Sequence, residues 1–323
     1  MMNRSRRAEI AQETIDILTK QSYTTKPWES NDAVELDSDP VSVDLAASLQ
    51  AACDGTVFHP VGQVLSSSAK RGATTATTTQ VHVCNDTTFG CARRLAERSV
   101  DVGHLAALNF ASAMHPGGGF LRGALAQEEA LAATSGLYAC LTTDAAAPFY
   151  EYHHNQHGAR NKDSIKLYSS NMIFSPHVPV FRDSQINPQA RTLPLLSVPY
   201  TCSIITSCAV NQSVPNSGSQ KNKVRPSHET QQATREMQLR AHRVLQVAVH
   251  HGVDSLILGA WGCGVFGNSP QDIARAFAMA LRQADVQGRI PHVYFAIPGS
   301  TEDNKYWSFV HAFRHSSTAT ADR

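Results

Sequence analysis

Two adjacent carboxylates follow a run of three glycines in the stretch GGGFLRGALAQEEALA, residues 117–132. Glycine lets a backbone come close to a ligand and adopt positive φ angles. A carboxylate can give and take a proton at a bond that is being cleaved. The pattern therefore predicts a ligand-binding loop with acid–base chemistry beside it. The residues concerned are Gly117, Gly118, Gly119, Gln127, Glu128 and Glu129.

Glu128 and Glu129 are neighbours on an expected helix, so their side chains point about 100° apart. They cannot face each other across a glycosidic bond as the two carboxylates of a typical glycosidase do. They can divide the work, one holding sugar hydroxyls while the other moves a proton. Unpaired N–H groups of a first helical turn favour ionised carboxylates, so a general acid there needs burial or ligand phosphates to raise its pKa. The alternative is that the two glutamates only lie at a solvated helix end and have no catalytic role.

A second glycine loop, WGCGVFGN, occupies residues 261–268. Its G-x-G-x-x-G spacing is a weak signal alone, and its late position without a following acidic ribose ligand argues against a Rossmann site. Like the first loop, it follows a buried strand and precedes a helix, the place where open α/β sheets bind ligands. Two such loops can hold a diphosphate from two sides. The alternative is that the glycines only make tight turns.

Strands and helices alternate along the chain, which predicts an α/β layered domain. We expect an N-terminal helical extension with its boundary within residues 60–78, dividing the chain into residues 1–70 and 71–323. Residues 211–228 lack periodicity and are expected to form a loop. The expected strands are 80–84, 103–110, 164–174, 193–198, 203–210, 254–260 and 292–297, and the expected helices are 8–20, 43–53, 89–99, 127–141, 229–251 and 269–283.

The composition is that of a globular protein, with 323 residues, 42% hydrophobic and 17% charged. The net charge of +1 gives no strong overall attraction to nucleic acid or to an anionic membrane. No stretch approaches the ~20 apolar residues that span a bilayer, and no signal peptide is recognisable. These features indicate an intracellular protein that binds neither membrane nor nucleic acid directly.

The seven cysteines form no CxxC pair and no four-ligand zinc pattern. We therefore expect them to be small buried side chains of a protein in a reducing compartment. The segment HHNQH at residues 153–157 is expected to form a solvated polar loop. A metal site there is the alternative, which the i, i+1 spacing of its histidines disfavours. We expect neither a metal nor a cofactor.

The stretch LNFASAMHPGGGFLRGALAQEEALAATSGLY, residues 108–138, resembles the signature of the microbial-type poly(ADP-ribose) glycohydrolases, which are built on a macrodomain. The hallmark of that family is GGG, a gap of six to eight residues and then QEE, and the gap here is seven. Residues 83–97, 172–183 and 256–277 are also similar to the family. The resemblance covers about residues 75–300. It implies a macrodomain-like mixed sheet with helices on both faces.

The resemblance also implies an activity, the hydrolysis of ribose–ribose O-glycosidic bonds with release of ADP-ribose, and roles for the matching residues. Glu129 would be the acid and base, Glu128 would hold the hydroxyls of the cleaved sugar, and Gln127 would order the loop. An oxocarbenium-like centre would develop and be stabilised by the nearby diphosphate, without a metal. The substrate contacts implied are Asn109, Gly117, Gly118, Gly119, Gly262, Gly264, Val265, Phe266 and Gly267, with Phe266 on the reacting ribose or, alternatively, a core aromatic.

Other functions fit the same fold. One alternative is a non-catalytic macrodomain that reads ADP-ribose, and another is a hydrolase that removes mono-ADP-ribose from a protein side chain such as arginine. The expected partners are poly(ADP-ribose) or ADP-ribosylated proteins, with ADP-ribose as product. A monomer is expected, located in the cytoplasm or, in a eukaryote, the nucleus. The resemblance favours exo over endo cleavage.

Overall fold

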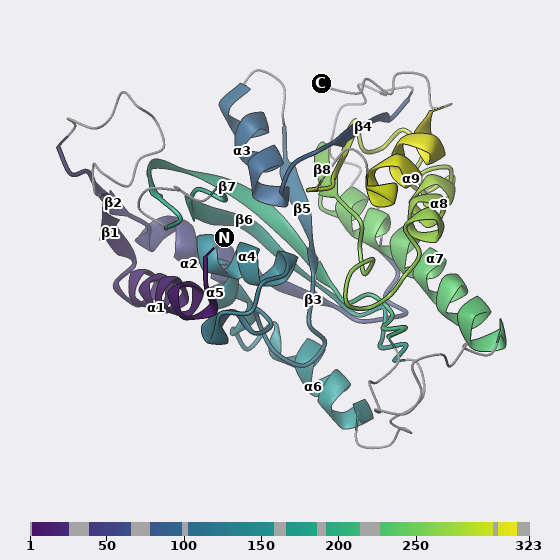
Figure 1. Cartoon of the computed structure of the whole chain (residues 1–323), viewed down its shortest axis with the longest axis horizontal. Helices are drawn as coiled ribbons and strands as arrows, with labels where there is room; N and C mark the ends of the chain where they lie inside the picture. Colours follow the sequence, from purple (N-terminus) through teal and green to yellow (C-terminus); the bar gives the residue numbers. More distant parts are fainter. Residues whose placement is uncertain are drawn as a thin grey trace.

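The computed structural model describes residues 2–25, 39–65, 78–98, 103–157, 166–185, 192–213, 227–299 and 303–314 (Figure 1). A mixed sheet of seven strands, in the order β3-β6-β7-β5-β8-β9-β4, organises these residues. From β7 to β4 the neighbouring strands run parallel, whereas β6 and β3 pair antiparallel. The strands are β3 (Val57–His59), β4 (Gln80–Cys84), β5 (Leu105–Phe110), β6 (Met172–Arg182), β7 (Leu195–Ser207), β8 (Ser255–Leu258) and β9 (His292–Ala296).

Helices cover both faces of this sheet, as predicted (Figure 1). Alternate residues of β5 point to opposite faces, because side chains alternate along a strand. Ala106 and Leu108 pack in the core beneath α7, α8 and α9, while Leu105 and Ala107 pack in the core beneath α2 to α6. The helices are α1 (Arg4–Lys20), α2 (Ala46–Asp54), α3 (Thr88–Arg98), the 3-10 helix η2 (Phe120–Arg122), α4 (Gln127–Thr134), α5 (Leu137–Leu141), α6 (Ala147–His157), α7 (Ser227–His250), α8 (Pro270–Ala280) and α9 (Asn304–Phe313).

Local sequence signals explain where several helices begin. Thr87 accepts a hydrogen bond from the backbone N–H of Gly90 at the start of α3. Ser269 accepts from the N–H of Asp272 at the start of α8, and Pro270 occupies the first turn. Both arrangements satisfy N–H groups that have no partner within the helix. The predicted starts of these two helices are confirmed.

The N-terminal segment contains α1, α2 and a small sheet of β1 (Ser22–Thr24) and β2 (Ser42–Asp44). It is mostly helical, as predicted, and it lies against the rest of the chain. The hydroxyl of Thr14 donates to the carbonyl of Ala133 at 2.7 Å, and β3 is the edge strand of the main sheet. The predicted domain boundary at residue 70 lies outside the described residues and stays a prediction.

The single helix predicted over residues 127–141 is wrong, because the structure breaks it into α4 and α5. Ser135 adopts an extended conformation (φ −147°, ψ 177°) and forms a β-bridge with Val180. Gly136 donates its N–H to the carbonyl of Pro179, where a side chain would meet Leu49 and Pro179. A tertiary contact therefore outweighs the local helical periodicity.

The strand boundaries around residues 164–210 also differ from the prediction. The strand expected at 164–174 begins only at Met172 and continues to Arg182, and the two strands expected at 193–198 and 203–210 form one strand, β7. Pro176 in β6 lies at a register shift between Ser175 and Val178. Proline is tolerated at such irregularities, so it does not end this strand.

The histidine-rich segment 153–157 is helical rather than a polar loop, and it forms the end of α6. His153 is buried, with one ring nitrogen bonded to the Phe149 carbonyl at 2.7 Å and the other to Ser169. Among the described residues, no group of three His, Cys, Asp or Glu side chains is placed to hold a metal ion. In that part of the chain no helix is both long and apolar enough to cross a bilayer. A loop is expected at residues 211–228, of which residues 214–226 lie outside the described residues.

Candidate active site

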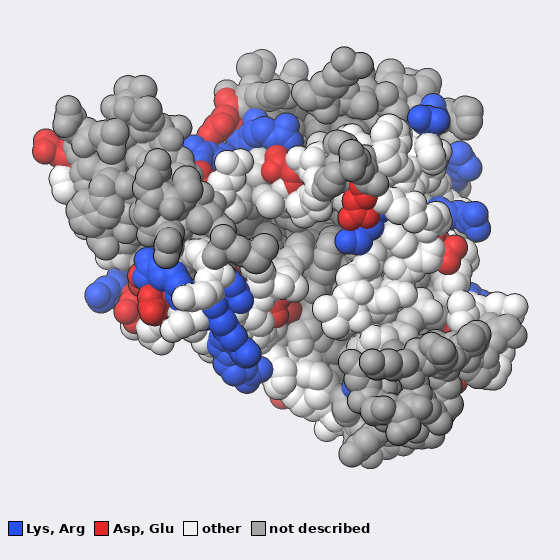
Figure 2. Space-filling model, in the orientation of Figure 1, with Lys and Arg blue, Asp and Glu red and all other residues white. Residues whose placement is uncertain are grey.

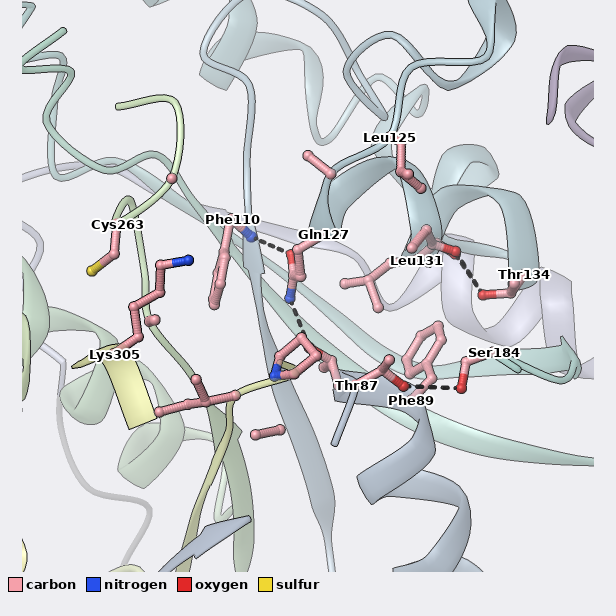
Figure 3. Close-up of a pocket in the computed structure, with 18 of the residues that line it drawn as sticks. Thr87, Phe89, Phe110, Leu125, Gln127, Leu131, Thr134, Ser184, Cys263 and Lys305 are labelled. Carbon is pink, nitrogen blue, oxygen red and sulfur yellow. Dashed lines mark hydrogen bonds between the residues drawn. The ribbon is translucent and has the colours of Figure 1, made fainter. Parts of the chain in front are cut away.

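The side chain of Gln127 ties the first turn of α4 to the end of β5 (Figure 3). Its carbonyl oxygen accepts from the N–H of Phe110 at 2.8 Å, and its amide nitrogen donates to the carbonyl of Leu108 at 2.7 Å. A further bond of 3.1 Å reaches the hydroxyl of Thr88 on α3. Gln127 therefore positions the two carboxylates that follow it, as the predicted ordering role requires.

Glu128 points inward and is 3% exposed. One carboxyl oxygen accepts from the N–H of Ser112 at 2.6 Å, and the other accepts from the amide of Asn109 at 3.3 Å. Burial raises the pKa of Glu128 to about 8, and the neighbouring charge of Glu129 adds to the effect, while these hydrogen bonds oppose it. Desolvation thus outweighs the favourable N–H groups at the helix start.

Glu129 is half-buried, and its carboxylate turns to the glycine loop. It accepts a hydrogen bond from the N–H of Gly119 at 2.9 Å. Gly118 has φ +63°, and a Cβ atom there would overlap the carboxylate of Glu129 and crowd that of Glu128. The middle glycine is therefore required both by its backbone conformation and by the space that the two carboxylates occupy.

Polar atoms without a protein partner surround Glu128. Asn109 is fully buried, and its amide also contacts Thr206 at 3.3 Å, yet its carbonyl oxygen has no hydrogen-bond partner. The hydroxyl of Tyr150 is likewise buried and unpaired, and burial together with the charge of Glu128 raises its pKa. Buried polar groups are rarely left unpaired in proteins. These atoms can therefore bind hydroxyl groups of a ligand or ordered water.

The second glycine loop is held by Asn268, whose amide donates to the carbonyls of Val210 and Gly262. A Cβ at Gly262, where φ is +72°, would meet Asn268 and Ala209. Gly267 also has a positive φ of +69°. Val265 projects into solvent with 83% exposure, and Phe266 is half-buried with its ring centroid 6.2 Å from that of Tyr168. This position is compatible both with a contact between Phe266 and the reacting ribose and with Phe266 as a core aromatic.

The second glycine loop and the first turn of α4 border a pocket of about 370 Å³ (Figure 3), and Gly117, Gly118 and Gly119 are not among the residues that line it. Gln127 of α4 and Gly264 of the second loop both line it, together with the aromatic rings of Phe89 and Phe110. In Figure 3, Cys263 and Lys305 lie on one side of Phe110 and Leu125 and Leu131 on the other. A mostly apolar hollow with a few polar groups at its edge is a typical site for a small organic ligand.

Glu129 lies away from the pocket. The α4 residues that line the pocket are Gln127, Ala130, Leu131 and Thr134. At about 100° per residue, Glu129 points roughly 200° around the helix from Gln127, so it faces nearly the opposite side. A ligand with its bulky end in the pocket would therefore pass the glycine loops to reach Glu129.

Sequence reasoning predicted both loops and the QEE residues, and it missed residues supplied by distant elements. Lys305, at the start of α9, lines the pocket, and its position depends on a helix that follows the last strand. Tyr150 comes from α6, whose helical nature the histidine-rich segment obscured. Of these residues, only Thr206 could have been found from the sequence, because it lies near the end of a strand that pairs with β5.

Comparison with known proteins places this arrangement in a family. Residues 11–183 match the family model described as "Microbial-type PARG, catalytic domain". A search of curated proteins finds no significant match.

Solved structures give the same result over more of the chain. The X-ray structure of poly(ADP-ribose) glycohydrolase from Thermomonospora curvata is 37% identical, with a TM-score of 0.71, over 95% of this chain and 99% of that chain. The same protein bound to the inhibitor ADP-HPD is 38% identical, with the same TM-score and coverage. The poly(ADP-ribose) glycohydrolase from Deinococcus radiodurans in complex with ADP-ribose is 36% identical, with a TM-score of 0.65, over 82% of this chain and 96% of that chain.

Proposed function

The chain belongs to the microbial-type poly(ADP-ribose) glycohydrolase family, and we propose that it hydrolyses ribose–ribose bonds of poly(ADP-ribose) with Glu129 as general acid and base. The observation that carries this proposal is the hydrogen bond from Gly119 to Glu129. It joins the one half-buried carboxylate of the QEE motif to the loop that would carry the substrate. The products are ADP-ribose and a polymer shortened by one or more units.

Glu128 and Glu129 take different parts because their surroundings differ. Glu128 is sealed from solvent and bonded to Ser112 and Asn109, so it holds ribose hydroxyls rather than reaching a leaving oxygen. Glu129 is more accessible and can move a proton to and from the substrate. Asn109 acts through Glu128, and its unpaired carbonyl oxygen can accept from a ribose hydroxyl.

The reaction then follows in two proton transfers. Protonated Glu129 gives its proton to the leaving ribose oxygen as the glycosidic C–O bond breaks. Positive charge develops at the anomeric carbon, where the substrate's own diphosphate stabilises it. The Glu129 carboxylate then takes a proton from the water that attacks this carbon, which regenerates the acid.

The terminal adenosine occupies the pocket lined by Phe89 and Phe110, and the diphosphate lies at the two glycine loops. Two features support this placement. The pocket has apolar walls suited to a base. The α4 helix also begins at Gln127 without a side-chain cap, because the preceding residue is Ala126, and this leaves N–H groups for an anion.

The substrate is poly(ADP-ribose) or an ADP-ribosylated protein, and the active form is a monomer located inside the cell. Both loops, the pocket and the carboxylates come from one chain, so no second copy is needed to complete the site. The seven cysteines are all free thiols, which suits a reducing compartment.

The test is incubation with purified poly(ADP-ribose) and, separately, with an ADP-ribosyl-arginine peptide, followed by chromatography of the products. Free ADP-ribose from the polymer alone is expected. Release only from the arginine peptide would identify a mono-ADP-ribosyl hydrolase. Binding of ADP-ribose with no product from either substrate would identify a non-catalytic macrodomain that only binds ADP-ribose.

A further inference from the structure

Arginine side chains gather on the outer side of the first glycine loop, where α1 packs on η2. In Figure 2, Lys and Arg side chains form a strip beside α1 on the visible face. Three arginines meet at this contact: Arg4 and Arg7 from α1, and Arg122 from η2. We call them the arginine strip. Arg4 and Arg122 are exposed and Arg7 is half-buried.

The strip is held in place by backbone contacts rather than by acids. The Nε of Arg4 donates to the carbonyl of Arg122 at 2.9 Å, and the Nε of Arg7 donates to the carbonyl of Gly123 at 2.9 Å. Gly123 has φ +68°, and a Cβ there would overlap the backbone of Arg4, so the two elements pack without space between them. The Nη1 of Arg7 also donates to the carbonyl of Met2, so Arg7 is fixed at two points, whereas Arg4 is fixed only through its Nε and keeps its outer N–H groups for a ligand.

No carboxylate neutralises the strip within the described residues. The two acidic residues of α1 nearest to it are already engaged elsewhere. Glu9 pairs with Arg6 at 3.0 Å, and Glu13 pairs with Arg6 and with Arg182. The strip is thus a local positive surface on a chain whose net charge is only +1.

The strip is also coupled directly to the catalytic loop. The N–H of Arg122 donates to the carbonyl of Gly119 at 3.0 Å, and the N–H of Gly119 donates to Glu129. Glu129 faces away from the pocket side of α4. With the terminal unit in the pocket, the polymer beyond the scissile bond must therefore leave from the side of Glu129 and the glycine loop.

We propose that Arg4, Arg7 and Arg122 bind the diphosphate groups of the polymer on the leaving side of the scissile bond. This inference rests on the proposed function. Every ADP-ribose unit carries a diphosphate, and guanidinium groups bind phosphate oxygens in pairs of parallel hydrogen bonds. The strip gives the N-terminal helix a role: it favours long polymers over free ADP-ribose without touching the terminal unit.

The test measures binding in a Glu129→Gln background, which needs no turnover, with two ligands: polymer of about twenty units and free ADP-ribose. Arg122→Gln is the main variant, because Arg122 bonds to Gly119 and to Arg4 through its backbone, which the substitution leaves in place. We expect its affinity for the polymer to fall about three- to tenfold, more at low salt than at high salt, and its affinity for ADP-ribose to stay the same. Arg122→Lys restores only part of the loss, because it keeps the charge but not the paired N–H groups of the guanidinium. Arg282→Gln, an exposed arginine after α8, is the matched control and changes neither affinity.

Equal polymer affinity in Arg122→Gln and its parent would overturn the proposal. So would an equal loss for polymer and ADP-ribose, which would place Arg122 in the terminal-unit site. If single-stranded DNA of similar charge competes with the polymer as well as the polymer itself does, the strip is a general polyanion surface and the assignment to poly(ADP-ribose) is wrong. Hydrolysis by the wild type is scored separately, so failure of the proposed activity cannot be confused with failure of the strip.

Discussion

The carboxylate of Glu129 accepts a hydrogen bond from the backbone N–H of Gly119 at 2.9 Å, so the glycine loop holds the side chain that the reaction uses. The three glycines and the two glutamates therefore form one unit. The two carboxylates occupy the space where a side chain of Gly118 would lie, while Phe120 crowds that of Gly117 and Ala124 that of Gly119.

Gly118→Ala should reduce polymer hydrolysis by at least about 100-fold, because the new methyl group displaces Glu129 and strains a positive φ. Steady-state rates at saturating polymer measure the effect. Gly62→Ala is the control, since Gly62 has φ +87° with nothing within 4 Å of a Cβ, so it carries the strain alone. Equal activity of the two variants would show that the contact with Glu129 is unimportant.

Gln127→Glu should lower both stability and activity. The new carboxylate can still accept from the N–H of Phe110, but it cannot donate to the carbonyl of Leu108. An unpaired buried acceptor costs about 1–3 kcal/mol, which denaturant unfolding can measure. Gln283→Glu, at an exposed position, is the control. A Gln127→Glu protein as stable and active as the wild type would contradict the ordering role.

Glu128 should make the protein less stable as pH rises. Burial raises its pKa in the folded state to about 8, from an ordinary value of 4.5, so the folded state holds an extra proton between these values. The free energy of unfolding therefore falls through this window, by up to about 1.4 kcal/mol for each pKa unit. Glu128→Gln removes the titration, so its stability relative to wild type should increase from pH 5 to pH 8. Profiles of wild type and variant that stay parallel, as expected for the exposed control Glu151→Gln, would refute the assignment.

A group of packed histidines that includes the half-buried His251 and the buried His59 should make the protein sensitive to acid. Burial lowers the pKa of His251 to about 3, and facing histidines such as His59 add to the effect. His251 is neutral in the folded state, so its contribution to stability is fully present above about pH 6.5 and is lost as pH falls toward 3. His251→Gln should make the unfolding free energy decline less steeply below pH 6.5, because unfolding of the variant takes up as much as one proton fewer than unfolding of the wild type. The exposed His311→Gln should leave the slope unchanged, and an unchanged slope in both variants would contradict the prediction.

Local chemistry made much of this structure predictable. The positive φ angles of the glycine loops, the caps at Thr87 and Ser269 and the burial of β5 all follow from residues close in sequence. Predictions were wrong where distant residues decide. The break at Ser135 depends on Val180, and the role of Lys305 depends on how α9 folds back to the pocket. The different environments of Glu128 and Glu129 likewise arise from tertiary contacts, although their different directions follow from helix geometry.

The proposed activity depends most on Glu129, which performs both proton transfers. The most direct test compares wild type, Glu129→Gln and the exposed control Glu151→Gln on purified poly(ADP-ribose), with chromatography of released ADP-ribose and a parallel measurement of ADP-ribose binding. We expect Glu129→Gln to lose at least about 1000-fold in rate while it still binds ADP-ribose, and we expect the control to match wild type. A Glu129→Gln protein that releases ADP-ribose at the wild-type rate would contradict the claim.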